Sequence, residues 1–516
     1  MWHKVLFIPF CLLIGSGFCF AQDPMDSMGL HEQDQYRQHF SVLKQAALDK
    51  KKYSKYGRLL LQYSGAKGGL RQAQQAYQKQ NIQFYTEGWT QLQRFHVAGT
   101  FMFSRKMEDS LANNLRSDQD PLAPFYYFAG KAGNFNRQNY KAEALLAYEL
   151  LPKRFAPLMK LDYQTHWTTG NVDPRPDVKI FSIKYKPGFM WSPQGHRIEL
   201  NGIFGHSIQE VSLSYKNRNF QESLLYPERI HYLNLGYGYA SIKDSSRMRK
   251  FRRYRGAELS YSKSFKKLDF QAELAYEHVL EESTHDMKSR KTYSIRDRFY
   301  LNTYRFHLLM DKRGVHTQQQ WRLSGVYQSG YDGARDFSPD FQRINYELVQ
   351  KQFQGDYLIS WHKGRSWEKE LEGSLAFQGL AQQDYAQGNK LDVQNFTFAL
   401  NLHNYWKDSQ GNRYILHIGP SYRLPGQVTL EMQDNAITPF TRQVIFTDYY
   451  YALSQILGAN LGFEYIASQW IKGIPLGLSA QYRGLFKLNT QEASLEGARM
   501  PEGSRNQIQI GLHLYL

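Results

Sequence analysis

Residues 506–516 read NQIQIGLHLYL and alternate strictly between aliphatic and polar or aromatic side chains. Because successive side chains of an extended strand point to opposite faces, one face is purely aliphatic. Its members are Ile508, Ile510, Leu512, Leu514 and Leu516. Such a strand must lie against either a protein core or lipid, so the rest of the chain has to decide between a soluble β-sandwich and a membrane barrel.

Other segments repeat this alternation, notably residues 396–406 (FTFALNLHNYW) and 476–486 (LGLSAQYRGLF). Several exceed the usual globular strand and approach the length of roughly 9 to 11 residues that a tilted membrane strand needs. Aromatic residues make up 15% of the chain, yet its mean hydropathy is −0.60. No apolar run is long enough for a membrane-spanning helix. An aromatic-rich, alternating chain of this kind indicates a transmembrane β-barrel.

The connections between these segments favour the barrel over a Greek-key sandwich. Counting back from the C-terminus, tight links occur at residues 467–469, 407–411, 362–366, 311–314 and 264–267. Longer links separate them, at residues 489–504, 425–442, 383–389, 331–342, 281–290 and 243–253. Short turns at one rim and longer loops at the other are typical of an up-and-down barrel. The count loses parity between residues 206 and 229, so we predict only an even number of strands, roughly 16 to 20.

The N-terminal segments differ from the rest. Residues 1–21 carry Lys4, an apolar run and a small-x-small site, and are expected to be a cleaved signal peptide. The two cysteines, Cys11 and Cys19, lie in this segment, so the mature chain would have no thiol. Residues 22–80 are polar, with helical spacing in residues 34–53, and are expected to form a periplasmic helical arm or partial plug. The barrel is then expected to span residues 81–516.

The terminal strand also resembles a known assembly signal. Gln509, Gly511, Leu514 and Leu516 match the pattern by which the barrel-assembly machinery of Gram-negative outer membranes recognises its substrates. The chain departs from the pattern at its last residue, which is Leu516, where many such signals have Phe or Trp. The resemblance implies insertion into the outer membrane after export.

The mature chain further resembles an uncharacterised family of outer-membrane β-barrels known only as a domain of unknown function. The resembling stretches are residues 85–104 (YTEGWTQLQRFHVAGTFMFS), residues 170–176 (GNVDPRP) and the terminal strand. Membership implies the fold and the cellular location. It implies no activity and no catalytic residues.

Candidate lumen-lining residues follow from the alternation, because polar side chains opposite the aliphatic ones would face inward. They are Asn401, His403, His417, Gln481, Arg483 and His513. No second His or carboxylate is spaced to complete a metal site, so we expect these histidines to form hydrogen bonds in the lumen, with transient metal contact as the alternative.

Enzyme motifs for hydrolases, metalloproteases and nucleotide binding are absent from the sequence. A carboxylate–imidazole pair could come from Glu277–His278 and His285–Asp286, but an ordinary polar loop is the favoured interpretation. We therefore predict no catalytic residues, no cofactor and no metal.

Residues 247–255 (RMRKFRRYR) form the most basic stretch, and we expect them in an outer loop. Its cations are Arg247, Arg249, Lys250, Arg252, Arg253 and Arg255. The signal peptide makes nucleic acid an improbable partner, whereas arginines suit lipopolysaccharide phosphates or another anion. Removal of residues 1–21 lowers the formal net charge of the chain only from +17 to +16, which favours anions at the surface or in a pore.

Two functional hypotheses remain open. The first is an outer-membrane channel or transporter for small polar or anionic solutes. The second is an accessory or binding barrel, closed by its N-terminal arm, that supports a surface lipoprotein or nutrient receptor. Polar inner faces would favour the first hypothesis, and a bulky, tyrosine-rich interior would favour the second.

Overall fold

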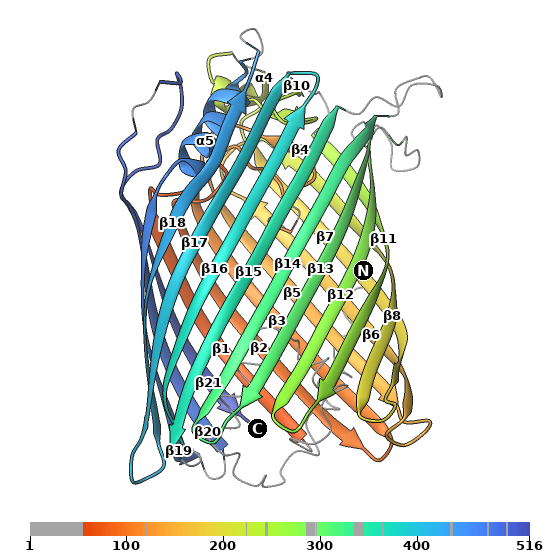
Figure 1. The fold of residues 1–516 in the computed structure, drawn as a ribbon. Coiled ribbons are helices and arrows are strands. Elements are labelled where there is room, and N and C mark those ends of the chain that lie inside the picture. The colour runs from red at the N-terminus through yellow and green to blue at the C-terminus, as the bar shows by residue number, and fades with distance from the viewer. Residues whose placement is uncertain are drawn as a thin grey trace.

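The computed structural model describes residues 55–119, 122–222, 224–242, 246–284, 295, 297–334, 345–363, 366–433, 437–471, 474–491 and 494–516. The expected signal peptide and the expected helix in residues 34–53 lie outside these described residues. The described chain forms a tall barrel with tilted strands (Figure 1).

Eighteen strands form one antiparallel sheet. The first nine are β1 (Lys55–Gly68), β2 (Gln78–Leu92), β3 (Phe95–Leu111), β5 (Gly133–Tyr148), β6 (Phe155–Gly170), β7 (Arg175–Trp191), β8 (His196–Ser214), β11 (Arg247–Ser264) and β12 (Leu268–Thr284). The others are β13 (Asp297–Arg313), β14 (Thr317–Ala334), β15 (Tyr346–Lys363), β16 (Ser366–Asp384), β17 (Asn389–Lys407), β18 (Arg413–Glu431), β19 (Ile456–Ile471), β20 (Ile474–Lys487) and β21 (Ser504–Tyr515). Since β1 pairs with both β2 and β21, the sheet closes on itself, which confirms the predicted barrel with an even strand number.

The aliphatic face of β21 points outward, as the alternation predicts. Ile508 and Ile510 are 53% and 54% exposed, whereas His513 and Tyr515 on the other face are 8% and 3% exposed. Phe398 and Leu400 of β17 and Leu478 and Tyr482 of β20 are likewise exposed. Exposed apolar side chains around a closed barrel form the surface that contacts lipid.

This orientation predicts a sharp difference between neighbouring positions of β21. Ile510→Arg should destabilise the folded barrel by about 2–4 kcal/mol, because a charge on the lipid face near mid-membrane is costly. Gln509→Arg places the same charge on the inner face and should be tolerated. The folded fraction can be measured as the heat-modifiable band in gel electrophoresis. Equal loss of that band in both variants would contradict the assigned faces.

The two rims of the barrel differ in their connections. Tight turns join β2 to β3 and β11 to β12, and they lie at the same rim as the C-terminus (Figure 1). The longest connections, residues 112–132, 215–246 and 432–455, lie at the opposite rim, which we call the outer rim. The parity lost between residues 206 and 229 is explained by β8, which runs to Ser214 and is followed by a long excursion outside the wall.

Two expected boundaries are corrected by the structure. The wall begins at Lys55 rather than at residue 81, so the second half of the expected arm contributes β1 and the start of β2. The basic stretch 247–255 is the outer half of strand β11 rather than a loop. Its charges pair with those of neighbouring strands, as described below, so it can lie in the wall.

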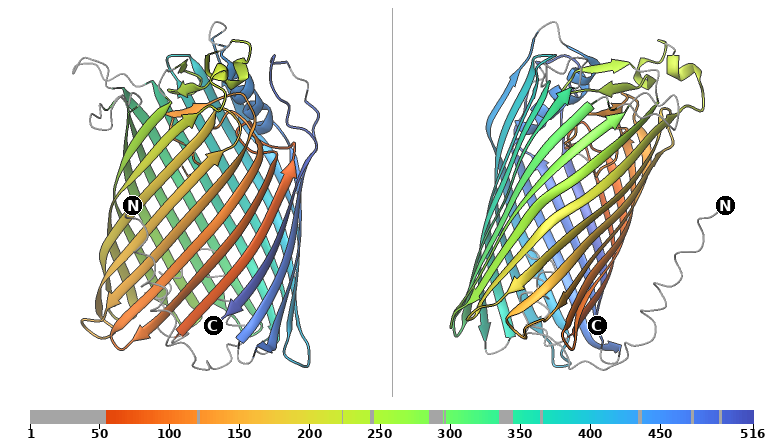
Figure 2. Two further views of the ribbon diagram at one scale, coloured as in Figure 1. Left: turned by 180° about the vertical axis from the view of Figure 1, so that it is seen from behind. Right: turned by 90° about the vertical axis from the view of Figure 1, so that its right-hand side faces the viewer.

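A folded cap bridges the lumen at the outer rim (Figures 1 and 2). It contains a small sheet of β4 (Tyr126–Phe128), β9 (Tyr232–Asn234) and β10 (Ala240–Ile242). Beside it, a π-helical turn, Thr441–Ile445, runs into α5 (Phe446–Ala452). The same connections also hold α4 (Asn219–Glu222) and the 3-10 turn η1 (Pro227–Arg229).

The cap packs on opposite walls through two hydrophobic clusters. On one side, Tyr126 and Phe128 share a cluster with Phe299 of β13, Leu348 of β15 and Leu391 of β17. On the other side, Tyr127 and Leu233 share a cluster whose wall residues come from β3, β5, β7, β8 and β11. Because the side chains of β4 alternate between these clusters, the small sheet crosses the lumen from wall to wall.

Candidate functional site in the barrel lumen

One side of the lumen is lined by ion pairs, and we call the inward side chains of β6, β7, β8, β11 and β12 the charged wall. Lys160 Nζ of β6 donates to Glu199 of β8 and lies 3.3 Å from Glu258 Oε1 of β11. Lys184 Nζ of β7 lies 2.7 Å from Glu277 Oε2 of β12. Glu199 and Glu258 are 0% and 4% exposed. Buried charges of this kind are tolerated only when they are paired and hydrogen-bonded.

These contacts reach across several strands of the wall. The partners Lys160 and Glu258 belong to strands with β7 and β8 between them. Along a flat sheet, three strand steps would separate them by about 14 Å. The long Lys160 and Glu258 side chains therefore extend toward each other across β7 and β8, and both are buried from water.

The other side of the lumen carries accessible neutral amides, together with a buried ion pair in which Arg322 Nη1 of β14 lies 3.2 Å from Glu372 Oε1 of β16. We define the amide wall as Gln352 and Gln354 of β15, Gln378 of β16 and Gln481 of β20. All four are exposed, although they alternate with outward residues such as Phe353 and Tyr482. An exposed side chain on the inner face contacts the lumen. The amide wall thus offers hydrogen-bond donors and acceptors to a polar solute.

The six candidate lumen residues all lie on inward faces of the wall strands, and the structure brings some of them together. His403 and His417 lie side by side, with 3.4 Å between their Nδ1 atoms. His513 contacts Arg58 Nη2 at 2.6 Å and Ser479 Oγ at 2.9 Å. Of the remaining three, Gln481 lies in register with His417 across Gly462 of β19, Arg483 is exposed, and Asn401 donates to Glu372 Oε2 at 3.3 Å.

The His403–His417 pair offers at most two imidazole ligands. Among the described residues, no group of three or more His, Cys, Asp or Glu side chains is arranged to hold a metal ion. His403 and His417 rings meet edge to face at a centroid distance of 4.4 Å, an ordinary aromatic arrangement. Hydrogen bonding within the lumen therefore remains our interpretation of these histidines.

The basic stretch on β11 divides between the two faces. Lys250 and Arg252 point inward and both contact Glu281, at 2.9 Å and 2.6 Å. The outward cations are Arg247, Arg249, Arg253 and Arg255. Their alternation explains why a stretch with so many charges can form a strand: neighbouring cations point to opposite sides of the wall.

The carboxylate–imidazole pair considered from the sequence is not assembled. Glu277 points inward to Lys184, whereas His278 points outward, with its Nδ1 atom 2.9 Å from Asn302 Oδ1. His285 and Asp286 lie outside the described residues. Adjacent strand residues face opposite sides of the barrel wall, so Glu277 and His278 cannot act on one substrate.

Sequence reasoning missed the clasp that holds the cap to the wall. We define this clasp as the turn Gly236–Tyr239 together with Asp384 of β16 and Asn389 of β17. Asp384 Oδ2 accepts hydrogen bonds from the backbone N–H groups of Tyr237 at 2.7 Å and Tyr239 at 2.9 Å. Asn389 Nδ2 donates to Tyr237 O at 3.0 Å. The only local sequence signal is the pair of glycines in GYG.

Both glycines of the turn are required because side chains of the barrel rim approach their Cα atoms closely. A Cβ at Gly236 would lie 2.3 Å from Asp384 Oδ2, and one at Gly238 would lie 2.3 Å from Asn389 Nδ2. Gly238 also has a φ of 109°, which disfavours side chains. The turn is therefore shaped to receive two polar side chains from the barrel rim.

A second polar contact joins the cap to the connection between β1 and β2. Asp448 Oδ1 of α5 accepts a hydrogen bond from Ala73 N at 2.8 Å. Burial raises the pKa of the Asp448 carboxyl to about 7, although this hydrogen bond acts in the opposite direction. A mixture of neutral and charged Asp448 is expected near neutral pH.

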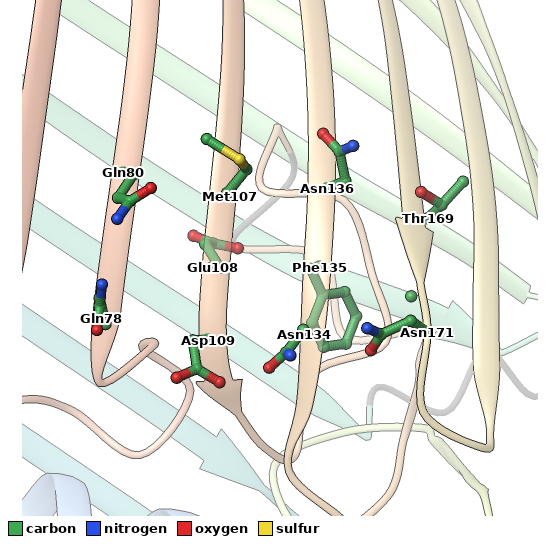
Figure 3. A pocket seen from close by; sticks show the side chains of 11 residues that line it. Gln78, Gln80, Met107, Glu108, Asp109, Asn134, Phe135, Asn136, Thr169 and Asn171 are labelled. Atoms are coloured by element: carbon green, nitrogen blue, oxygen red, sulfur yellow. The ribbon is translucent and has the colours of Figure 1, made fainter.

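A separate hollow of about 470 Å³ lies near the outer rim, at the ends of β2, β3, β5 and β6 (Figure 3). Its lining includes Gln78, Gln80 and Met107. Met107 shares the outward face of β3 with Phe101, which is 37% exposed. The hollow is thus on the outer surface of the wall and is not part of the lumen.

Comparisons with known proteins add a family and architectural similarities. A family model described as a family of unknown function (DUF6850) matches residues 45–516. No curated protein matches the sequence. Among the described residues, no helix is long and apolar enough to cross a membrane.

Solved structures with similar architecture are outer-membrane receptors, transporters and porins. They include the FrpB iron transporter of Neisseria meningitidis in its apoprotein form, with 7% identity, coverage of 94% of this chain and 82% of that chain, and a TM-score of 0.41. The ferric preacinetobactin receptor BauA of Acinetobacter baumannii has 8% identity, coverage of 89% and 80%, and a TM-score of 0.39. An anion-selective porin of Comamonas acidovorans has 8% identity, coverage of 90% and 98%, and a TM-score of 0.29. At these TM-scores, no property of those proteins is transferred to this chain.

Proposed function

The chain belongs to the DUF6850 family of unknown function, and we propose that it is an outer-membrane pore for small polar solutes with a cap that controls its outer entrance. The observation that carries this proposal is the amide wall, because Gln352, Gln378 and Gln481 are inward and yet exposed. Such side chains can replace the water of a passing polar solute.

The charged wall supports uncharged polar solutes over anions. Although the chain is strongly basic, the inward cations Lys160, Lys184 and Lys250 of the charged wall are each engaged by carboxylates, whereas Arg483 on the inner face of β20 is exposed. A paired cation presents little net field to the lumen. The excess positive charge of the whole chain is therefore a weak argument for an anion pore.

The cap favours a second candidate, the accessory barrel. A tyrosine-rich sheet bridging two walls would hinder passage and could present outer loops to a surface lipoprotein or receptor. Insertion through the barrel-assembly machinery, with Gln509, Gly511, Leu514 and Leu516 as its signal, is part of both proposals. The two candidates differ in whether solutes move through the lumen.

Cysteine labelling tests whether the amide wall contacts water. In a background with Cys11 and Cys19 replaced by Ser, we expect Gln352→Cys and Gln481→Cys to react with a charged thiol reagent in lipid vesicles. Phe353→Cys, which faces lipid, should react more than about tenfold slower because a thiol in hydrocarbon stays protonated. Asn201→Cys on the charged wall is a second control, since Asn201 is 0% exposed.

The same variants separate the two candidates. In planar bilayers, labelling at Gln481→Cys should reduce the solute-driven current if the lumen conducts. Slow labelling of both glutamine positions would contradict an accessible lumen. Fast labelling without any current, even after the cap is released as described in the Discussion, would favour the accessory barrel.

A further inference from the structure

The outward cations of the basic stretch form a ladder interrupted once, by Phe251, which we define as Arg247, Arg249, Arg253 and Arg255 of β11. We propose that this arginine ladder binds the phosphate groups of an anionic lipid in the outer leaflet. The ladder occupies the outer half of the strand, and the apolar residues Ala257, Leu259 and Tyr261 follow on the same face toward the other rim.

The strand register shows which side chains lie beside the ladder. Arg255 pairs with His278 of β12, and His278 pairs with Asn302 of β13. Asn302 is flanked on the outward face by Tyr300 and Tyr304. Aromatic rings of this kind mark the membrane interface, where lipid headgroups lie. The arginines of β11 therefore lie beside strands that carry outward tyrosines.

An aromatic belt continues from this level across the neighbouring strands. Tyr276 and Tyr304 have ring centroids 5.0 Å apart, and Tyr300 and Tyr331 are stacked at 5.0 Å. Tyr276, Tyr304 and Tyr331 are 38%, 49% and 39% exposed. The ladder therefore adjoins a surface that already fits the boundary between acyl chains and headgroups.

Acidic side chains on this face neutralise the cations only in part. Arg249 pairs with Glu210 of β8. Glu282 of β12 is shared, at 2.6 Å from Arg253 and 3.0 Å from Arg298 of β13. None of the described carboxylates lies within ion-pair distance of Arg255, which is exposed. One carboxylate between two guanidinium groups leaves a net positive surface.

Arginine suits phosphate better than lysine because its planar group donates two parallel hydrogen bonds. A charged side chain directed at the membrane is costly unless a partner of opposite charge meets it there. A lipid phosphate satisfies both requirements, since it lies at the interface and its acyl chains can pack beside the exposed rings of Phe204 and Tyr276.

The test is a titration of the folded full-length barrel in neutral detergent with diphosphoryl lipid A. The unfolding temperature should rise with lipid concentration, because a ligand that binds only the folded state stabilises it. The double variant Arg253→Gln/Arg255→Gln should bind lipid A with an apparent affinity about 10- to 30-fold weaker. Each lost arginine–phosphate contact is expected to reduce the affinity by roughly one order of magnitude or less. Lys351 is an exposed, outward lysine of β15, so the control variant Lys351→Gln should bind lipid A as the wild-type protein does.

Two further ligands decide what is bound. Dephosphorylated lipid A should give little stabilisation, and inorganic phosphate should give none at the same concentration. An equal effect of phosphate alone would show a free-anion site and overturn the lipid proposal. Equal stabilisation of the original chain and the double variant, or no stabilisation by lipid A, would also overturn it.

Discussion

Asp384→Ala should raise the conductance of the barrel, because it weakens the hold of the wall on the cap while the two hydrophobic clusters remain. The change removes the carboxylate that accepts the backbone N–H groups of Tyr237 and Tyr239. A hydrogen bond to a charged group contributes about 1.5–3 kcal/mol, so losing both should cost the closed cap about 3–6 kcal/mol. This corresponds to a rise of about 100-fold or more in the ratio of released to clasped cap.

The measurement is single-channel conductance in planar bilayers, supported by the heat-modifiable band that shows an intact barrel. Asp392→Ala is the matched control, because Asp392 lies on the outward face of β17 near the same rim. Gly236→Ala tests the clasp independently, since its Cβ would lie 2.3 Å from the Asp384 carboxylate. A folded Asp384→Ala barrel with unchanged conductance would refute the role of the clasp as a closing contact.

Lys160→Met should produce the largest loss of stability among substitutions in the lumen. It leaves the buried carboxylates of Glu199 and Glu258 without their shared cation. Breaking a buried ion pair by removing one partner typically costs about 3–5 kcal/mol. Lys186 Nζ is 3.9 Å from Glu258 Oε2, so compensation from that side should be partial.

The free energy of unfolding can be measured by urea titration of the barrel in lipid vesicles. Lys141→Met is the control: the side chain of Lys141 is 44% exposed and pairs with Glu143, so we expect a loss below about 1 kcal/mol. Replacing Glu199 and Glu258 by Gln in the Lys160→Met background should restore part of the stability. If the Lys160→Met variant were as stable as the wild-type protein, the charged wall would not be a buried network of ion pairs.

Much of the barrel could be predicted from strand alternation, because the side chains of each wall strand alternate between lipid and lumen. The faces of β17, β20 and β21 and the inward position of Asn401 and Gln481 follow directly from that pattern. Strand β1 was missed because Leu59, Leu60 and Leu61 place apolar side chains on both faces. The aliphatic side chain of Leu60 points inward, where the alternation predicts a polar residue.

The errors at the basic stretch and the cap have a different cause. The basic stretch of β11 was predicted to be a loop because the carboxylates that neutralise its cations, Glu281 and Glu282, lie on the neighbouring strand. The clasp likewise joins Tyr237 to Asp384, residues 147 positions apart. Neither partnership leaves a local pattern, so only the folded arrangement shows it.

The composition of the cap implies an order of events in assembly. Its contact between Ala73 and Asp448 joins residues 375 positions apart, and its clusters draw wall residues from strands on opposite sides of the barrel. Contacts so distant in sequence form only after the intervening chain has been ordered. The cap is therefore expected to mature after β1 and β21 have joined, so each newly inserted barrel would pass through an uncapped stage.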